Sequence, residues 1–236
     1  MSNPVFFCSD LSGDRVLLDG PEGRHAAVVR RLRVSEVVDL VDGAGTRCTC
    51  RVVTTTRDTV TCDVTQRVLE PAPSPRITLV QALAKGDRGE LAVELATEVG
   101  VDEVVPWAAA RCIVSWSGER GAKALERWRS TAHEAGKQSR RAWFPDVTEP
   151  VATSGITTLP GQLLVLQEDA TTALSSVELD GDVVLVVGPE GGISPEELEA
   201  FQAAGAIAVR LGSSVLRTST AGAVAVALVS SRTGRW

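Results

Sequence analysis

The chain has 236 residues, of which 44% are hydrophobic, so it can form one large domain or two small ones with a real core. Its formal net charge of −6 counts at first sight against a nucleic-acid partner. No apolar run approaches the roughly 20 residues of a membrane span, and we find no signal-peptide pattern. Its five cysteines include no pairs at zinc spacing, so we expect reduced thiols, no metal and a cytoplasmic location.

Residues 1–72 are expected to form the first domain, a small β-barrel. Short β-like runs at residues 37–41, 48–56 and 60–65 are separated by turn signals. Several short strands at close spacing are typical of such barrels. A basic cluster at residues 24–33 interrupts the runs, and we expect it to form a short helix.

The proline-rich segment 71–75 is the best linker in the sequence. Alternate prolines favour an extended, stiff connector. We therefore place the domain boundary there, and the second domain covers residues 73–236.

From residue 77 onward, strand-like and helix-like patterns alternate, which predicts an α/β domain with a mostly parallel sheet. The expected strands are residues 77–81, 104–106, 163–166, 183–187 and 206–209, and the expected helices are residues 90–99, 123–141 and 220–230. One more helix is expected to begin at Ser194, because Ser194 can cap it, Pro195 suits its first turn and Glu197 completes a capping box.

Charge is strongly segregated along the chain. Residues 111–145 hold eight Lys or Arg against three Asp or Glu, whereas residues 146–209 hold eleven acids and no Lys or Arg. A basic stripe can bind a polyanion even on an acidic protein. A solvated helix face explains the stripe equally well on charge alone.

The most informative stretch is the loop 188–192, Gly-Pro-Glu-Gly-Gly, between the apolar run 183–187 and a helix start. Open α/β sheets bind ligands at such junctions. The loop has neither the Lys of a P-loop nor the spacing of a dinucleotide fold, and Glu190 would repel a pyrophosphate. We therefore expect a neutral or partly cationic ligand, since three glycines exceed what a plain turn requires.

A second loop, residues 211–222, also follows a strand and precedes a helix. Thr218, Ser219 and Thr220 are expected to cap that helix. Arg217 can orient a carboxylate or a phosphate, although a surface arginine is as plausible from this loop alone. The two loops can build one pocket, which could hold an adenosine moiety without phosphate contacts.

Together the two loops resemble the cofactor loops of SPOUT methyltransferases, and in particular those of the ribosomal RNA small subunit methyltransferase E family. The likeness spans most of the chain and includes the motifs Lys85-x-Asp-Arg88, Thr97-Glu98-x-Gly100, Glu126-Arg-Trp128 and Gln138-Ser-x-Arg141. The chain departs from the family pattern at Arg24 (usually His), Lys137 (usually Glu) and Arg140 (often Gly).

The resemblance implies a SPOUT-type parallel sheet with a trefoil knot, an exception to the usual unknotted chain, behind an RNA-binding barrel similar to PUA domains. It implies a homodimer that uses S-adenosylmethionine to methylate N3 of one uridine in small-subunit rRNA, in an assembled or nearly assembled subunit. Two alternatives remain: an rRNA-binding assembly factor without catalysis, and, ranked last, a dehydrogenase-like enzyme that lacks the expected glycine fingerprint.

Site residues follow from the loops and the resemblance. Arg217 is the candidate cation that stabilises the uracil anion, and Glu190 is a weaker candidate for the base. The expected cofactor-binding residues are Leu166, Gln167, Glu168, Val187, Gly188, Pro189, Glu190, Gly191, Gly192, Leu211, Gly212, Val215, Leu216, Thr220 and Ala221. The expected RNA-binding residues are Arg24, His25, Arg30, Arg31, Arg33, Arg111, Gln138, Arg140 and Arg141.

Overall fold

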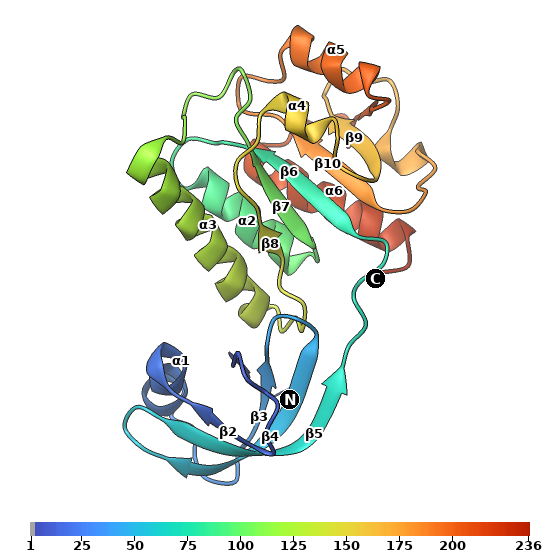
Figure 1. Ribbon diagram of the computed structural model, residues 1–236. Helices are drawn as coiled ribbons and strands as arrows, with labels where there is room; N and C mark the ends of the chain where they lie inside the picture. The colour runs from blue at the N-terminus through green and yellow to red at the C-terminus, as the bar shows by residue number, and fades with distance from the viewer. Residues whose placement is uncertain (1–2) are drawn as a thin grey trace. The chain divides into compact units, whose positions relative to one another are not determined.

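The computed structural model describes residues 3–236, which form two compact units (Figure 1). The first unit runs to Ala72 and also includes residues 136–144. The second comprises residues 73–135 and 145–236. Within residues 3–236, no helix is both long and apolar enough to cross a bilayer.

The first unit is built on a curled five-stranded sheet that forms a half-barrel. The strand order is β1-β3-β4-β5-β2, with β1 parallel to β3 and the other pairs antiparallel. The strands are β1 (Val5–Phe7), β2 (Arg15–Leu18), β3 (Val37–Val41), β4 (Thr46–Thr55) and β5 (Val60–Leu69). Two irregularities in the β4–β5 pairing interrupt its register, and such bulges bend a sheet. The concave core holds Phe6, Leu40 and the thiols of Cys48, Cys50 and Cys62.

The basic cluster is helical as expected only as far as Val29, and residues 30–33 are not helical. Helix α1 (Gly20–Arg24) continues directly into a π-helical turn, η1 (His25–Val29). Ala26 is buried in the core of the unit, while Arg24 and Val29 are exposed. The segment therefore buries one face and presents cations on the other.

Residues 136–144 belong to the first unit, although the sequence analysis assigned them to the second domain. The Gly45 N–H donates to the Ala142 carbonyl at 3.0 Å, and the Phe144 N–H donates to the Gly43 carbonyl at 2.9 Å. A Cβ on Gly45 would lie 2.6 Å from the Trp143 ring, so only glycine allows this approach. These contacts join positions distant in sequence, which local patterns do not reveal.

The second unit contains a six-stranded sheet, in the order β11-β9-β10-β6-β7-β8, in which all neighbouring strands are parallel. The strands are β6 (Ile77–Ala82), β7 (Glu103–Trp107), β8 (Asp146–Val147), β9 (Gln162–Leu166), β10 (Val183–Val187) and β11 (Ile207–Val209). Strands β6 and β10 are fully buried along their length, as the continuous apolar run of β10 predicts for that strand.

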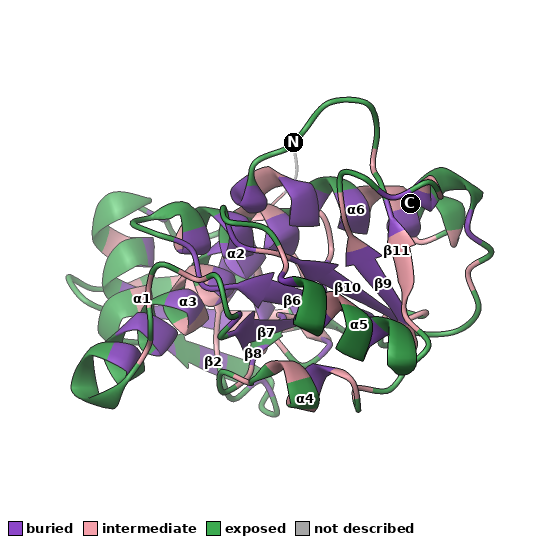
Figure 2. Cartoon of the chain, turned by 90° about the horizontal axis from the view of Figure 1, so that it is seen from above, coloured by how far each residue is buried: buried purple, intermediate pink, exposed green. Residues whose placement is uncertain are grey.

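Helices cover both faces of this sheet (Figures 1 and 2). Leu79 points to the face that also buries side chains of α2 (Arg88–Glu98), α3 (Gly118–Gln138) and α6 (Thr218–Arg232). Its neighbour Val80 points to the opposite face, with α4 (Thr153–Ile156) and α5 (Pro195–Ala203). A short 3₁₀ turn, η2 (Leu174–Ser176), lies between β9 and β10.

Local signals predicted several helix boundaries well. The capping box at the start of α5 is present, since Ser194 Oγ accepts from the Glu197 N–H and the Glu197 carboxylate accepts from the Ser194 N–H. On α3, the predicted apolar side is buried at Leu125, Trp128 and Ala132. The helix ends at Gln138, before the expected residue 141, because Arg140 has a left-handed backbone (φ 59°).

The chain makes an unusual return before its last helix. Strand β11 lies at the edge of the sheet, beside β9, whereas α6 packs against the central strands β10 and β6. The segment between β11 and α6 therefore leads back from the edge to the middle of the sheet. A trefoil knot requires a crossing of this kind, and the knot itself stays a prediction.

Candidate functional site

The candidate site lies where parallel strands of the second unit end. In the register of the sheet, Val187 at the end of β10 lies beside Gln81 of β6 and beside Leu166 of β9, which in turn pairs with Val209 of β11. The loops that follow these strands therefore emerge at the same edge. This is the edge at which open α/β sheets bind ligands.

The two loops singled out in the sequence meet directly. The Thr218 hydroxyl donates to the Gly188 carbonyl at 2.9 Å, and it accepts from Gln81 Nε2 at 2.9 Å. The expected role of Thr218, Ser219 and Thr220 as helix caps is wrong, because the cap position of α6 is Arg217 and no side chain caps it. Instead, the Thr218 hydroxyl links the start of α6 to the glycine loop.

Glu190 faces the loop that follows β6. Its Oε1 lies 3.4 Å from both the Lys85 backbone N and Arg88 Nη1, and its side chain is 23% exposed. The carboxylate therefore braces the glycine loop against a neighbouring loop. Of the Lys85-x-Asp-Arg88 motif, this contact gives a role to the side chain of Arg88.

Arg111 belongs to this site and not to the first unit with the other expected RNA-binding residues. Its guanidinium Nη1 donates to the Gly191 carbonyl at 3.2 Å. The backbone nearby is held as well, since the Ala110 N–H donates to the buried carboxylate of Glu197 at 2.8 Å. The loop after β7 is thus fixed against the glycine loop.

The glycines of the first loop are required by the loop itself. Gly192 has a φ of +74°, and a Cβ on Gly188 would lie 2.8 Å from Ile193 Cγ1. Part of the glycine content that we took to exceed the needs of a plain turn therefore serves the turn itself. Gly212 differs, because a Cβ there would have nothing within 4 Å. Gly212 is exposed and faces open space.

The second loop has exposed apolar side chains. Val215 is 75% exposed and Leu216 is 37% exposed, which is unusual for large aliphatic residues. Arg217, which follows them, is exposed, and within residues 3–236 its side chain makes no hydrogen bond or ion pair. This loop therefore combines apolar surface with one uncommitted cation.

The remaining expected cofactor residues lie beside these loops. The Gln167 N–H donates to the Val209 carbonyl at 2.9 Å, so residues 166–168 stay close to the end of β11. Thr220 and Ala221 occupy the first turn of α6. Gln81 was not among the expected site residues, although a glutamine in a fully buried strand is itself a signal.

The other expected RNA-binding residues are in the first unit. Those on α1, η1 and the following turn, which are Arg24, His25, Arg30, Arg31 and Arg33, are exposed. Gln138 and Arg140 are exposed and Arg141 is half-buried in residues 136–144. A buried ion pair between Lys137 and Glu22 joins this segment to α1, so two of the chain's departures from the family pattern, Arg24 and Lys137, lie next to one structural contact.

Two of these arginines have strained backbones. Arg140 has a φ of 59° and Arg31 a φ of 53°. The Arg140 N–H donates to the Lys137 carbonyl and the Arg141 N–H donates to the Gly136 carbonyl, both at 3.0 Å. This is a Schellman motif, in which the position of Arg140 usually belongs to glycine.

The cysteines carry no sign of a metal or a reactive centre. All five are free thiols, and burial raises the pKa of Cys50 to about 12 and that of Cys62 to about 11. Among residues 3–236, no group of three or more His, Cys, Asp or Glu side chains is placed to hold a metal ion.

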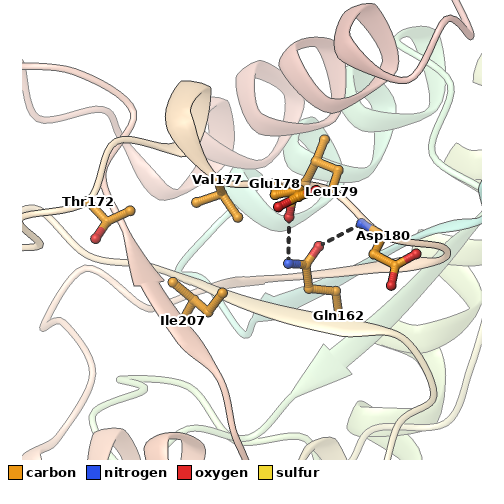
Figure 3. Close-up of a pocket in the computed structure, with 7 residues that line it drawn as sticks. All are labelled: Gln162, Thr172, Val177, Glu178, Leu179, Asp180 and Ile207. Carbon is orange, nitrogen blue, oxygen red and sulfur yellow. Dashed lines mark hydrogen bonds between the residues drawn. The ribbon is translucent and has the colours of Figure 1, made fainter.

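A separate depression lies beside β9 and β11 (Figure 3). The residues that line it are Gln162, Thr172, Val177, Glu178, Leu179, Asp180 and Ile207. The Gln162 amide is already occupied, because it donates to the Glu178 carbonyl at 2.9 Å and accepts from the Asp180 N–H at 3.4 Å. Since Gln162 and Ile207 begin their strands, this depression lies away from the cofactor loops.

Comparison with known families matches both units. Residues 70–230 match the model of an RNA methyltransferase domain, and residues 18–65 match that of an RNA methyltransferase PUA domain. The ribosomal RNA small subunit methyltransferase E of Mycobacterium bovis is 45% identical over 95% of this chain and 89% of its own length. The Bacillus subtilis protein of the same name is 26% identical over 92% of this chain and 90% of its own length.

Solved structures agree with these matches. The ribosomal RNA small subunit methyltransferase E of Neisseria gonorrhoeae, bound to S-adenosyl methionine, is 29% identical, with a TM-score of 0.87 over 98% of each chain. A putative methyltransferase from Legionella pneumophila, in complex with the bound cofactor SAM, is 26% identical, also with a TM-score of 0.87 over 98% of each chain.

Proposed function

The chain belongs to the ribosomal RNA small subunit methyltransferase E family and is an RNA methyltransferase with a SPOUT-type α/β fold, and on this basis we propose its reaction. The protein transfers a methyl group from S-adenosylmethionine to N3 of one uridine in small-subunit rRNA. The transfer breaks a sulfur–carbon bond, forms a nitrogen–carbon bond and releases the N3 proton.

One observation carries this proposal. The Thr218 hydroxyl bonds to the Gly188 carbonyl at 2.9 Å, so two loops that are distant in sequence form one wall. Loops that lay apart could not share one cofactor pocket. Their contact supports a single site at the carboxyl edge of the sheet.

The residues at this edge suit S-adenosylmethionine. The open space at Gly212 and the exposed side chains of Val215 and Leu216 can receive an adenosine moiety. Glu168 and Glu190 offer negative charge to a cationic ligand. When bound, the cofactor supplies the methyl group on a positively charged sulfur.

Arg217 and Glu190 have different roles in the proposed chemistry. N3 of uridine attacks only after losing its proton, and a cation near the uracil oxygens stabilises the anion that forms. Arg217 is exposed and uncommitted, so it can supply that cation. Glu190 is engaged with Arg88, and this favours a bracing role over that of the base.

RNA is bound through the cations of the first unit. Their exposed guanidinium groups can contact phosphates without reading sequence. The proposed contact set comprises Arg24, Arg30, Arg31 and Arg33, on α1 and the turn after η1, and Arg140, in the turn after α3. The overall charge of −6 does not oppose this, because the acidic residues 146–209 are in the second unit.

We also propose a homodimer that acts in the cytoplasm, where ribosomal subunits are assembled. Val215, Leu91 and Val224 are exposed on the second loop, α2 and α6. Apolar side chains on such surfaces are often covered by a partner. A partner here would help to enclose the cofactor.

The proposal is tested with purified protein, S-adenosylmethionine labelled in its methyl group, and unmodified small subunits or naked small-subunit rRNA. We expect the label in 3-methyluridine. Label in another nucleoside would contradict the assignment to uridine N3. Binding of rRNA without any transfer would favour a non-catalytic assembly factor instead.

A further inference from the structure

The Gln81 side chain lies beneath the point where the two cofactor loops meet. It is 0% exposed and belongs to β6, the strand next to β10 in the centre of the sheet. Gln81 Nε2 donates to the Thr218 hydroxyl at 2.9 Å and to the Ala82 carbonyl at 3.2 Å. Both amide protons of the side chain are therefore used.

Thr218 connects Gln81 to the glycine loop. Its hydroxyl is buried, accepts from Gln81 and donates to the Gly188 carbonyl at 2.9 Å. A hydroxyl has a single proton, so the Gln81 contact leaves that proton for Gly188. The two hydrogen bonds from Gln81 to Thr218 and from Thr218 to Gly188 thus link the central sheet to both loops.

The buried amide of Gln81 does not favour the stability of the fold. Gln81 Oε1 is buried and has no hydrogen-bond partner among the described residues. An unsatisfied buried acceptor is costly, and an apolar side chain of the same shape would avoid that cost. Buried polar networks instead select one geometry over others. The geometry selected here is that of the two loops.

We propose that Gln81 is a positioning residue, which acts through Thr218 to hold the two loops in the arrangement that binds S-adenosylmethionine. This inference rests on the proposed function, because it takes the loops to be the cofactor site. Gln81 touches neither the cofactor nor the RNA in this scheme. Its effect is on how well the loops are organised before the cofactor arrives.

The test measures the affinity for S-adenosylmethionine by calorimetry, and unfolding by circular dichroism, on the full chain. Thr218→Val keeps the shape but removes the hydroxyl, and we expect roughly tenfold weaker binding. Thr218→Ser restores the hydroxyl and should restore affinity. Gln81→Met should weaken binding by a similar factor without a matching fall in the unfolding midpoint.

Thr233→Val is the matched control. The Thr233 hydroxyl donates to the Val229 carbonyl at the far end of the same helix, at 2.9 Å. We expect this variant to bind S-adenosylmethionine as the unchanged protein does. The double variant Gln81→Met with Thr218→Val should bind no more weakly than Thr218→Val alone, since both changes break one chain of contacts.

The outcomes separate the inference from the proposed function. If the unchanged protein binds S-adenosylmethionine and the Thr218→Val and Gln81→Met variants bind it equally well, the positioning role is wrong and the proposed function stands. If affinity falls only in step with the unfolding midpoint and Thr218→Ser does not restore it, the two residues are merely structural. A protein that does not bind S-adenosylmethionine at all overturns both.

Discussion

Arg111 donates to the backbone carbonyl of Gly191 at 3.2 Å, and so joins the loop after β7 to the glycine loop. The sequence analysis grouped this arginine with the residues that bind RNA. Its hydrogen bond gives it a second candidate role, support of the glycine loop. The two assignments predict different defects when the guanidinium is removed.

Arg111→Ala should weaken binding of S-adenosylmethionine by about fivefold, because one hydrogen bond that holds the loop is lost. Affinity for small-subunit rRNA should stay the same. Calorimetry with the cofactor and filter binding with the RNA measure the two effects. Arg120→Ala, which removes an exposed arginine from α3, is the charge-matched control. Weaker RNA binding with unchanged cofactor affinity would return Arg111 to the RNA-binding set.

Arg217→Ala should slow methyl transfer by about a hundredfold, as expected when a group that stabilises a developing anion is removed. Cofactor and RNA should bind as before, because the Arg217 side chain makes no hydrogen bond or ion pair within residues 3–236. Single-turnover kinetics with saturating RNA measure the chemical step directly. An unchanged rate with bound RNA would remove Arg217 from the mechanism.

Arg140→Gly should have opposite effects on stability and on RNA binding. A left-handed backbone destabilises a folded protein by about 1–2 kcal/mol at an ordinary residue, and glycine relieves this strain. Glycine itself lowers the stability by about 0.5–1 kcal/mol, because it gives the unfolded chain more conformational freedom. The variant should therefore be more stable by up to about 1.5 kcal/mol. It should also bind rRNA more weakly, with a salt dependence reduced by about one phosphate contact.

Arg140→Lys separates charge from backbone strain in the same experiment. Lysine keeps the charge and the strain, so stability and RNA affinity should both stay close to those of the unchanged protein. Urea unfolding and RNA binding at several salt concentrations give both quantities. If Arg140→Gly binds rRNA as tightly as the unchanged protein, the arginine serves no RNA contact.

Stability should fall at alkaline pH through the buried thiols of the first unit. Burial raises the pKa of Cys50 from 9.0 to about 12. Below pH 9.0 the thiol is protonated in both the folded and the unfolded chain, and its contribution to stability is complete. Above pH 9.0 the unfolded chain loses the thiol proton, whereas the folded chain keeps it. Stability therefore declines as the pH rises to about 12. Urea unfolding across this range should show a smaller decline in Cys50→Ala. An equal decline in both proteins would contradict this origin.

Much of the second unit could be predicted from local patterns. The apolar runs that became β9 and β10, and the capping box at Ser194, are signals carried by neighbouring residues. The paired loops were also recognisable, because each follows a strand and precedes a helix. Short elements without a pattern were not: β1 and β8 have three and two residues.

Other features depend on contacts between distant residues. The Thr218 hydroxyl was expected to cap its own helix, but a carbonyl from another loop, that of Gly188, competes for its proton. Residues 136–144 pair with the turn between β3 and β4, and nothing in their own sequence indicates that partner. Arg111 shows the same limit, since its partner is a backbone carbonyl.

The most direct test of the account is mass spectrometry of nucleosides from small-subunit rRNA of a strain that lacks this protein. We predict that 3-methyluridine disappears from that rRNA and returns when the unchanged protein, but not Arg217→Ala, is supplied. If every modification remained, or if a different one were lost, the central claim that the two joined loops hold a methyl donor for uridine N3 would be contradicted.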